Sequence, residues 1–272
     1  MATYLDRILA SHRAAAAVDP RSVDSLLDRL PGCAAVRGFR AALAAIAASG
    51  ELAVISEVKR RSPSKGDLHA DLDPADLAGR YEKGGATALS VLTDEEYFGG
   101  SPEDLQAARS ATSLPVLRKD FTVGPHDVLD ARLMGADAVL LIAAALDGTE
   151  LDDLYTLATE VGLDVLIEVH DEAELERAVA VGATLVGVNQ RDLTTFQVDT
   201  ERAVRMAPRM PDGVVRVAES GVGGPDDAAR LAAAGYHAIL VGETLVTSGD
   251  PASAVRAMRR APIDRPAPRE LP

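Results

Sequence analysis

Runs of apolar residues alternate with amphipathic stretches along most of the chain. The runs are rich in β-branched residues and nearly continuous, which is typical of strands that are covered on both faces of a parallel sheet. The predicted strands are Leu52–Lys59, Ala88–Thr93, Val116–Asp120, Ala138–Ile142, Asp164–Val169, Leu185–Asn189, Val214–Glu219 and Ala238–Gly242. Proline near the start and glycine near the end of the stretches between them indicate helices.

The spacing of these strands predicts a closed barrel. Strand starts recur at intervals of roughly 20–35 residues, which is the length of one βα unit. Such units in an uninterrupted series predict an α/β protein with a (β/α)8 TIM barrel. An open doubly wound sheet is the structural alternative, but it has fewer strands and a glycine-rich first turn. The turn Arg60–Gly66 lacks that fingerprint, so the barrel is favoured.

Three segments are expected along the chain. Residues 1–50 are rich in alanine and predict an N-terminal helical extension packed on the barrel, with residues 51–260 forming the catalytic barrel. Residues 261–272 contain several prolines and predict a disordered tail. The helical patterns in the extension cover Tyr4–Ala17, Ser22–Leu30 and Ala34–Ala47.

Composition narrows the possible partners. The chain has 42 acidic and 28 basic residues, a net charge of −14, which disfavours nucleic acids and anionic membranes as partners. The longest apolar run, Ala138–Leu146, is too short to cross a membrane. The single cysteine, Cys33, excludes a disulfide framework and favours a reducing cytoplasm. The histidines lack metal-ligand spacing, so we expect no metal site. We also expect no cofactor, and we expect the protein to be a monomer in the cytoplasm.

Polar residues end several of the predicted strands. In a barrel, the reactive groups lie at the carboxyl ends of the strands. Charges at the ends of apolar strands are costly to bury unless they are paired or used, so this set predicts a catalytic centre. Ion pairing or solvation remains the alternative for each residue alone, and is favoured for Arg118, Asp120, His170 and Asp192, which alternate away from the inward face. The inward set is Glu57, Lys59, Lys119, Glu168, Asn189, Arg191 and Glu219.

Two further features predict an anionic ligand. Ser220 and Gly221 follow the seventh strand and Gly242 follows the eighth, where many barrels bind phosphate through backbone N–H groups. The loop 59–66 carries four cations in eight residues, and predicts a mobile flap over the ligand, with Ser62 as a hydroxyl donor. The expected partner is therefore a small phosphorylated molecule.

Six motifs occur in order along the chain: Ser56–Gly66, Val91–Ser101, Pro115–Phe121, Ile167–His170, Gly187–Leu193 and Ala218–Gly221. They are similar to those of the indole-3-glycerol phosphate synthase family. The resemblance implies a (β/α)8 barrel with extra N-terminal helices. It also implies that 1-(2-carboxyphenylamino)-1-deoxyribulose 5-phosphate is closed to indole-3-glycerol phosphate with loss of CO₂ and water, a carboxy-lyase step of tryptophan biosynthesis.

The resemblance also implies roles for individual residues. Lys119 matches the lysine that protonates the developing alkoxide, and Glu168 matches the glutamate of the later dehydration. Glu57 and Lys59 match the pair on strand one, where Lys59 binds the substrate carboxylate or acts as the acid of dehydration. Asn189 is expected to bind a substrate hydroxyl and Arg191 to contact the carboxylate side of the anthranilate group. Glu219 is expected to orient the lysines and hydroxyls. The implied substrate-binding residues are Ser62, Ser220, Gly221 and Gly242 around the phosphate, and Phe98, Phe121, Leu140 and Leu193 around the ring.

Two other functions fit parts of the pattern. A Schiff-base aldolase would use Lys119 or Lys59 as a nucleophile, but neighbouring glutamates raise a lysine pKa, which is the wrong direction for a free amine. A non-catalytic sugar-phosphate binder would not need three carboxylates near an anionic ligand. The lyase is therefore the leading prediction.

Overall fold

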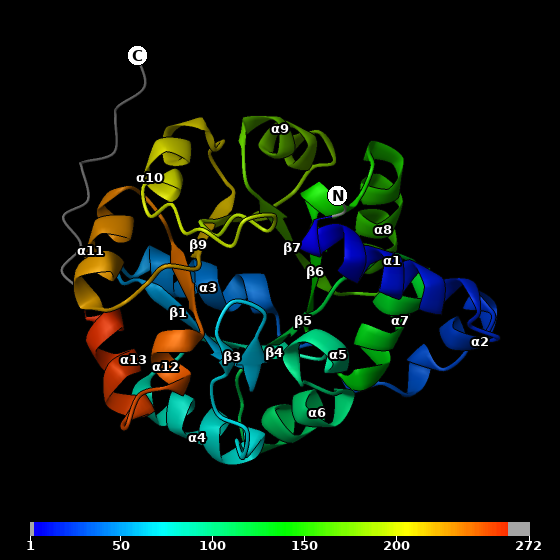
Figure 1. Cartoon of the computed structure of the whole chain (residues 1–272), viewed down its shortest axis with the longest axis horizontal. Coiled ribbons are helices and arrows are strands. Elements are labelled where there is room, and N and C mark those ends of the chain that lie inside the picture. The colour runs from blue at the N-terminus through cyan, green and yellow to red at the C-terminus, as the bar shows by residue number, and fades with distance from the viewer. Residues whose placement is uncertain (1–2, 261–272) are drawn as a thin grey trace.

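The computed structural model describes residues 3–260, so the predicted tail lies outside the described residues. Parallel strands form a closed barrel in the order β1-β10-β9-β8-β7-β6-β5-β4, which confirms the predicted (β/α)8 fold (Figure 1). A short antiparallel hairpin, β2 (Arg61–Ser62) and β3 (Gly66–Asp67), follows β1. The barrel strands are β1 (Ala53–Val58), β4 (Ala88–Leu92), β5 (Val116–Lys119), β6 (Ala138–Ile142), β7 (Asp164–Val169), β8 (Leu185–Asn189), β9 (Val215–Glu219) and β10 (Ala238–Val241).

Helices surround the barrel, as Figure 1 shows. Several of them begin with proline in the first turn and end at a left-handed glycine, such as Gly85 and Gly135, where the chain turns back toward the next strand. The helices after β1 are α4 (Pro74–Gly84), α5 (Glu95–Phe98), α6 (Pro102–Ala111), α7 (Pro125–Met134), α8 (Gly148–Glu160), α9 (Glu172–Ala180), α10 (Arg202–Met206), α11 (Pro225–Ala233), α12 (Glu243–Val246) and α13 (Pro251–Arg259). Short 3₁₀ turns are η1 (Leu30–Gly32), η2 (Ala143–Ala145) and η3 (Ala207–Arg209).

The inward face of the strands changes from apolar to polar along its length. On β1, Ala53 and Ile55 belong to the apolar core inside the barrel, and the next residue of that face, Glu57, lines a cavity. On β9, Val217 is followed in the same way by Glu219. The outward residues pack against the helices in a separate core. The period of two therefore carries charged side chains to one end of a barrel that is otherwise filled with apolar groups.

The N-terminal segment forms α1 (Tyr4–Ala17), α2 (Val23–Leu27) and α3 (Phe39–Ala48). The second helix ends earlier and the third begins later than the sequence pattern predicts. Pro31 lies in η1, and residues 34–38 form no helix because Arg37 is held by the barrel. The backbone N–H of Arg37 donates to Asp137 at 2.8 Å, and its guanidinium donates to three backbone carbonyls. These tertiary contacts override the local helical pattern.

The same segment reaches both ends of the barrel. The α3 side chains Phe39 and Leu43 are fully buried in the core inside the barrel, where they pack with Ala53 and Val215 at the amino ends of the strands. Helix α1 lies across the opposite end, and its buried residue, Ile8, joins the same internal core from the cavity side. Figure 1 shows α3 behind the ring of strands and α1 in front of it.

Candidate active site

A cavity of about 550 Å³ opens at the carboxyl ends of the strands. All the inward residues that the sequence singled out line it, and so do the expected phosphate and ring contacts. Charged groups therefore converge from β1, β5, β7, β8 and β9 on one space. The residues concerned are Glu57, Lys59, Lys119, Glu168, Asn189, Arg191 and Glu219, together with Ser62, Phe98, Phe121, Leu140, Leu193, Ser220, Gly221 and Gly242.

Lys119 lies between two buried glutamates. Its ammonium nitrogen Nζ is 3.2 Å from Oε2 of Glu168 and 3.8 Å from Oε2 of Glu219. Both glutamates are almost fully buried, with 1% of the surface of Glu168 and 2% of that of Glu219 exposed to solvent. No hydrogen-bond partner within residues 3–260 reaches Oε1 of Glu219. A buried polar atom of this kind is costly to leave unpaired, so it suits a partner supplied by a ligand.

The environment separates the proton affinities of these three groups. Burial opposes the charge on Lys119, but Glu168, Glu219 and Glu57 outweigh it, so the pKa of Lys119 is raised and the amine stays protonated. Burial also opposes the charge on Glu168, but Lys119 and His170 lower its pKa. The pKa of Glu219 is raised to about 8 by burial and by the charge of Glu168. The centre thus holds a lysine cation, a glutamate anion and a neutral glutamic acid near pH 7.

Two glycines make room for these side chains. A Cβ at Gly187 on β8 would lie 2.0 Å from Oε1 of Glu219, and a Cβ at Gly242 would lie 2.2 Å from Oε1 of Glu57. The same Glu57 oxygen accepts a hydrogen bond from Nζ of Lys59. A methyl group at either glycine would therefore displace a carboxylate of the centre.

Asn189 connects Glu168 with the loop that follows β8. Its Nδ2 donates to Oε1 of Glu168 at 3.0 Å, and its Oδ1 accepts from the backbone N–H of Arg191 at 3.0 Å. The Arg191 guanidinium donates to the Ser64 hydroxyl at 3.4 Å and to the Phe196 carbonyl at 3.2 Å. The loop cation is thereby tied to the hairpin that follows β1.

The expected phosphate site lies at the ends of β9 and β10. Ser220 and Gly221 both have positive φ, 65° and 72°, a conformation that is uncommon for serine. The side chain of Gln190 holds this turn by donating to the Ser220 carbonyl at 2.8 Å. Lys65 lies 3.6 Å from Glu243, the first residue of α12, so the hairpin and α12 face each other across the cavity mouth. Ser62 lines the same mouth.

The cation-rich loop differs from the sequence-based expectation. Lys59 and Lys65 line the cavity, but Arg60 and Arg61 do not. Arg60 forms an ion pair with Asp104 at 2.8 Å, and Arg61 donates to backbone carbonyls of α5, including that of Glu95 at 2.9 Å. These two arginines fasten the hairpin to its surroundings, so only Lys59 and Lys65 of the four cations face the cavity.

Aromatic side chains form one wall of the cavity. The rings of Phe98 and Phe121 lie 6.3 Å apart between centroids and are tilted by 37°. On the α1 side, the ring of Tyr4 packs edge-on against Phe196, with centroids 5.0 Å apart. This wall is suited to a flat aromatic group.

The residues that alternate away from the inward face make supporting contacts. Arg118 is buried and donates to Asp120 at 2.9 Å and to the Asp127 carbonyl at 2.7 Å. Asp192 accepts from the backbone N–H groups of the turn after β8. His170 pairs with Glu174 at 3.0 Å. Asp120 also lines the cavity, so its role reaches further than the sequence indicated.

Sequence reasoning missed the contribution of α1. Tyr4, Leu5 and Ile8 line the cavity, as does Phe196 after β8. The apolar face of α1 could be read from the sequence, but the sequence pattern does not show which part of the barrel that face covers. Among residues 3–260, one group could hold a metal ion: His12, Asp94 and Asp120 at the rim.

Comparison with known proteins agrees with this geometry. The sequence profile described as indole-3-glycerol phosphate synthase matches residues 5–258. A protein named indole-3-glycerol phosphate synthase from a Nocardioides species is 52% identical over 94% of this chain and 98% of its own length. One of the same name from Mycolicibacterium vanbaalenii is 49% identical over 93% of each chain. The chain belongs to the indole-3-glycerol phosphate synthase family.

Membership of the indole-3-glycerol phosphate synthase family settles the reaction class. The protein is a carboxy-lyase of tryptophan biosynthesis that forms indole-3-glycerol phosphate from a small phosphorylated substrate. Among solved structures, tryptophan synthase subunit alpha from Legionella pneumophila matches with a TM-score of 0.61 and 15% identity, covering 84% of this chain and 98% of its own. That likeness supports the barrel fold alone. No helix within residues 3–260 is long and apolar enough to span a membrane.

Proposed function

We propose that Lys119 is the acid of ring closure and Glu168 the principal base of the later dehydration, in the conversion of 1-(2-carboxyphenylamino)-1-deoxyribulose 5-phosphate to indole-3-glycerol phosphate. The observation that carries this proposal is the position of Lys119 between Glu168 and Glu219, at 3.2 and 3.8 Å, on the cavity wall. The ionised Glu168 helps to keep the amine protonated, as a proton donor must be.

Ring closure needs a proton at one oxygen. A bond forms between the ring carbon that carries the carboxylate and the C2′ carbonyl carbon, and the carbonyl oxygen becomes an alkoxide. Lys119 donates its proton to this oxygen, which is a far stronger base than an amine. The bond to the carboxylate carbon then breaks, CO₂ leaves, and its electron pair restores the aromatic ring. Glu168 stabilises the lysine cation before transfer.

Dehydration needs one acid and one base. The C2′ hydroxyl leaves as water after it gains a proton, and a proton is lost from C1′ to form the double bond of the indole. Glu168 is ionised beside Lys119 and His170, so it is suited to accept the C1′ proton. Lys59, which Glu57 contacts directly, is the cation available to supply the hydroxyl proton.

The remaining residues hold the two anionic ends and the ring. The backbone N–H groups after Ser220 and Gly242 and the hydroxyl of Ser62 are suited to the phosphate. Lys59 and Arg191 supply positive charge for the substrate carboxylate. The ring is placed beside Phe98, Phe121 and Leu193, and Asn189 is placed to hold a sugar hydroxyl.

We also propose that the active unit is a cytoplasmic monomer. All the residues of the proposed site come from one chain, and the single cysteine, Cys33, suits a reducing compartment. Sedimentation at assay concentration tests the first statement and fractionation of cells the second. A dimer whose dissociation abolishes turnover would contradict the monomer.

The test of the acid assignment is turnover followed by indole fluorescence. Replacing Lys119 with alanine should lower kcat by a factor of about 10²–10⁴, the usual contribution of a general acid. Its melting temperature should change little, because Glu168 and Glu219 can share a proton once the cation is gone. The matched control is Lys83→Ala, which removes an exposed lysine of α4 and should retain the wild-type rate.

Two outcomes would contradict the assignment. One is a Lys119→Ala variant that turns over at a near-normal rate. The other is trapping of the substrate on Lys119 by borohydride, which would show an amine nucleophile rather than an acid.

A further inference from the structure

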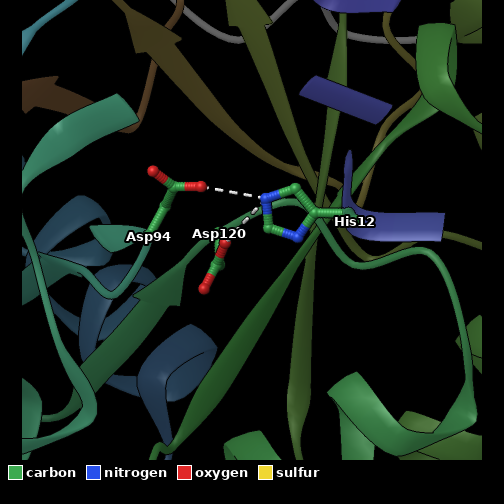
Figure 2. Close-up of side chains that lie close together, drawn as sticks. All are labelled: His12, Asp94 and Asp120. Carbon is green, nitrogen blue, oxygen red and sulfur yellow. Dashed lines mark hydrogen bonds and ion pairs between the residues drawn. The ribbon is translucent and has the colours of Figure 1, made fainter. Parts of the chain in front are cut away.

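His12 of α1 lies against two carboxylates of the barrel. Its Nε2 is 2.9 Å from Oδ2 of Asp94 and 4.0 Å from Oδ1 of Asp120 (Figure 2). Asp94 follows β4 and Asp120 follows β5, and both are nearly buried at the rim of the cavity. The imidazole of His12 is thus a polar connection between α1 and the loops over which this helix lies.

The other bonds of these carboxylates hold the aromatic wall. Oδ1 of Asp94 caps α5 by accepting the backbone N–H of Tyr97 at 2.6 Å and of Phe98 at 3.1 Å. Oδ1 of Asp120 accepts the backbone N–H of Phe121 at 2.8 Å. The His12 ring also lies 5.5 Å from the ring of Phe121. A movement of either carboxylate would therefore move a phenylalanine that lines the cavity.

We propose that His12 is a positioning residue, whose imidazolium fastens α1 across the cavity mouth and fixes Phe98 and Phe121 in place for the aromatic ring of the substrate. This inference rests on the proposed placement of that ring. His12 does not line the cavity, so it acts through Asp94 and Asp120 and not by touching the substrate.

The charges around His12 support its protonated form. Burial lowers the pKa of the imidazole, but the hydrogen bond that it donates to Asp94 and the charge of Asp120 outweigh burial and raise it, with a further contribution from Asp127 of α7. Arg118 faces Asp120 from the other side, at 2.9 Å. The connection should therefore be complete at low pH and weaken as pH rises through the raised pKa of His12.

A metal ion is the competing occupant of this cluster. One nitrogen and two carboxylate oxygens could ligate it. However, 2.9 Å between Nε2 and Asp94 is the length of a charge-assisted hydrogen bond, with the proton between the two atoms. A metal would have to displace that proton, so the geometry favours a hydrogen bond over a metal ion.

Kinetics separate positioning from general stability. In His12→Ala, KM should rise about 10-fold, as expected for a lost hydrogen bond to a charged group, while kcat changes by less than about 3-fold. The wild-type KM should increase as pH rises, and His12→Lys, with a charge that persists, should remove that dependence and restore a low KM. His69→Ala, which removes an exposed histidine before α4, is the matched control.

A measurement without substrate keeps the test independent of the proposed reaction. Hydrogen exchange of the α1 amides, corrected for the intrinsic rate, should be faster in His12→Ala and faster at high pH in the wild type. Absence of turnover by the wild type would contradict the proposed function alone. Unchanged KM together with unchanged α1 exchange would overturn the role of His12. If a chelator reproduces the His12→Ala phenotype and metal analysis finds an ion, the cluster is a metal site and the proposal is wrong.

Discussion

The two ends of the barrel are closed by the same N-terminal segment in different ways. At the amino ends of the strands, α3 inserts Phe39 and Leu43, both fully buried, into the apolar interior. At the carboxyl ends, α1 contributes one buried side chain, Ile8, and hydrogen bonds from Ser11, His12 and Arg13. The first closure is a packed core, and the second is a cover over a charged cavity.

This difference shows how stability and chemistry are kept apart in one domain. Apolar burial is large, non-directional and insensitive to pH, so it suits the end that is filled by the core. Hydrogen bonds and ion pairs are directional and can be exchanged for bonds to a ligand, so they suit the end where substrate enters. Glu168 and Lys119 are costly to bury, and the apolar end provides the stability that tolerates them.

The largest effect is expected from a change in the core at the amino ends of the strands. Phe39→Ala should lower the free energy of unfolding by about 3–5 kcal/mol, because it leaves a cavity in a fully packed core. Denaturant unfolding measures this loss. The kcat of the folded fraction should stay within about 2-fold of wild type, since an ordinary core change far from the site alters population and not chemistry. A large loss of kcat in the folded protein would show that the two ends are coupled.

A single methyl group tests the carboxyl end. Gly187→Ala places a Cβ where Oε1 of Glu219 lies, so that carboxyl group must move. We expect kcat to fall by about 100-fold, the effect of displacing a catalytic group by about 1 Å. Steady-state kinetics measure this, with Gly148→Ala, where a Cβ meets open space, as the control. Normal kinetics in Gly187→Ala would indicate that Glu219 has no fixed position during turnover.

The protonation of Glu219 predicts how the stability of the protein depends on pH. Burial and Glu168 raise the pKa of Glu219 to about 8 in the folded protein, against about 4.3 for glutamate in an unfolded chain. The folded state therefore binds more protons between these values, and this group lowers stability as pH rises through that window. Glu219→Gln should stabilise the protein at pH 8 by about 1–2 kcal/mol and lower its activity. If thermal unfolding at pH 5 and pH 8 shows equal gains, the carboxyl group is not protonated as described.

The smallest effect is expected from the C-terminal tail. Removing residues 261–272, which lie outside the described residues, should change the free energy of unfolding by less than about 0.5 kcal/mol. Turnover should be unchanged, because the residues of the described range that line the cavity end at Thr244. A severe loss of activity in the truncated protein would show that the tail takes part in the cover over the carboxyl end.

The barrel strands could be predicted because their signal is local. Each strand is a nearly continuous apolar run bounded by turn residues, and the structure contains a strand at every predicted run. The start of α3 at Phe39 could not be predicted, because the helical sequence pattern already begins at Ala34. Residues 34–38 instead form no helix, and Arg37 bonds to Asp137, a residue distant in the sequence. Helical propensity is weak beside such buried hydrogen bonds.

The candidate site divides in a similar way. Strand-end residues such as Glu57 and Glu219 could be chosen from the period of two and the rule for barrels, and the structure brings them into one cavity. The partners of Ile8 and His12 could not be predicted, because the sequence pattern of an amphipathic helix does not show which surface the helix covers. Gly187 had a readable signal, since an inward glycine inside a strand often marks a close approach by another group.

The pairing of β1 with β10 has a consequence for assembly. Ala53 lies opposite Ala238 in this ladder, so the earliest barrel strand finds its second neighbour only after the last strand has left the ribosome. Helix α3 contacts both β1 and β9, so it cannot seat fully before β9 has also been synthesised. The part of the polypeptide that is translated first is thus among the last to reach its final position, and until then its apolar side chains have no complete binding surface to occupy.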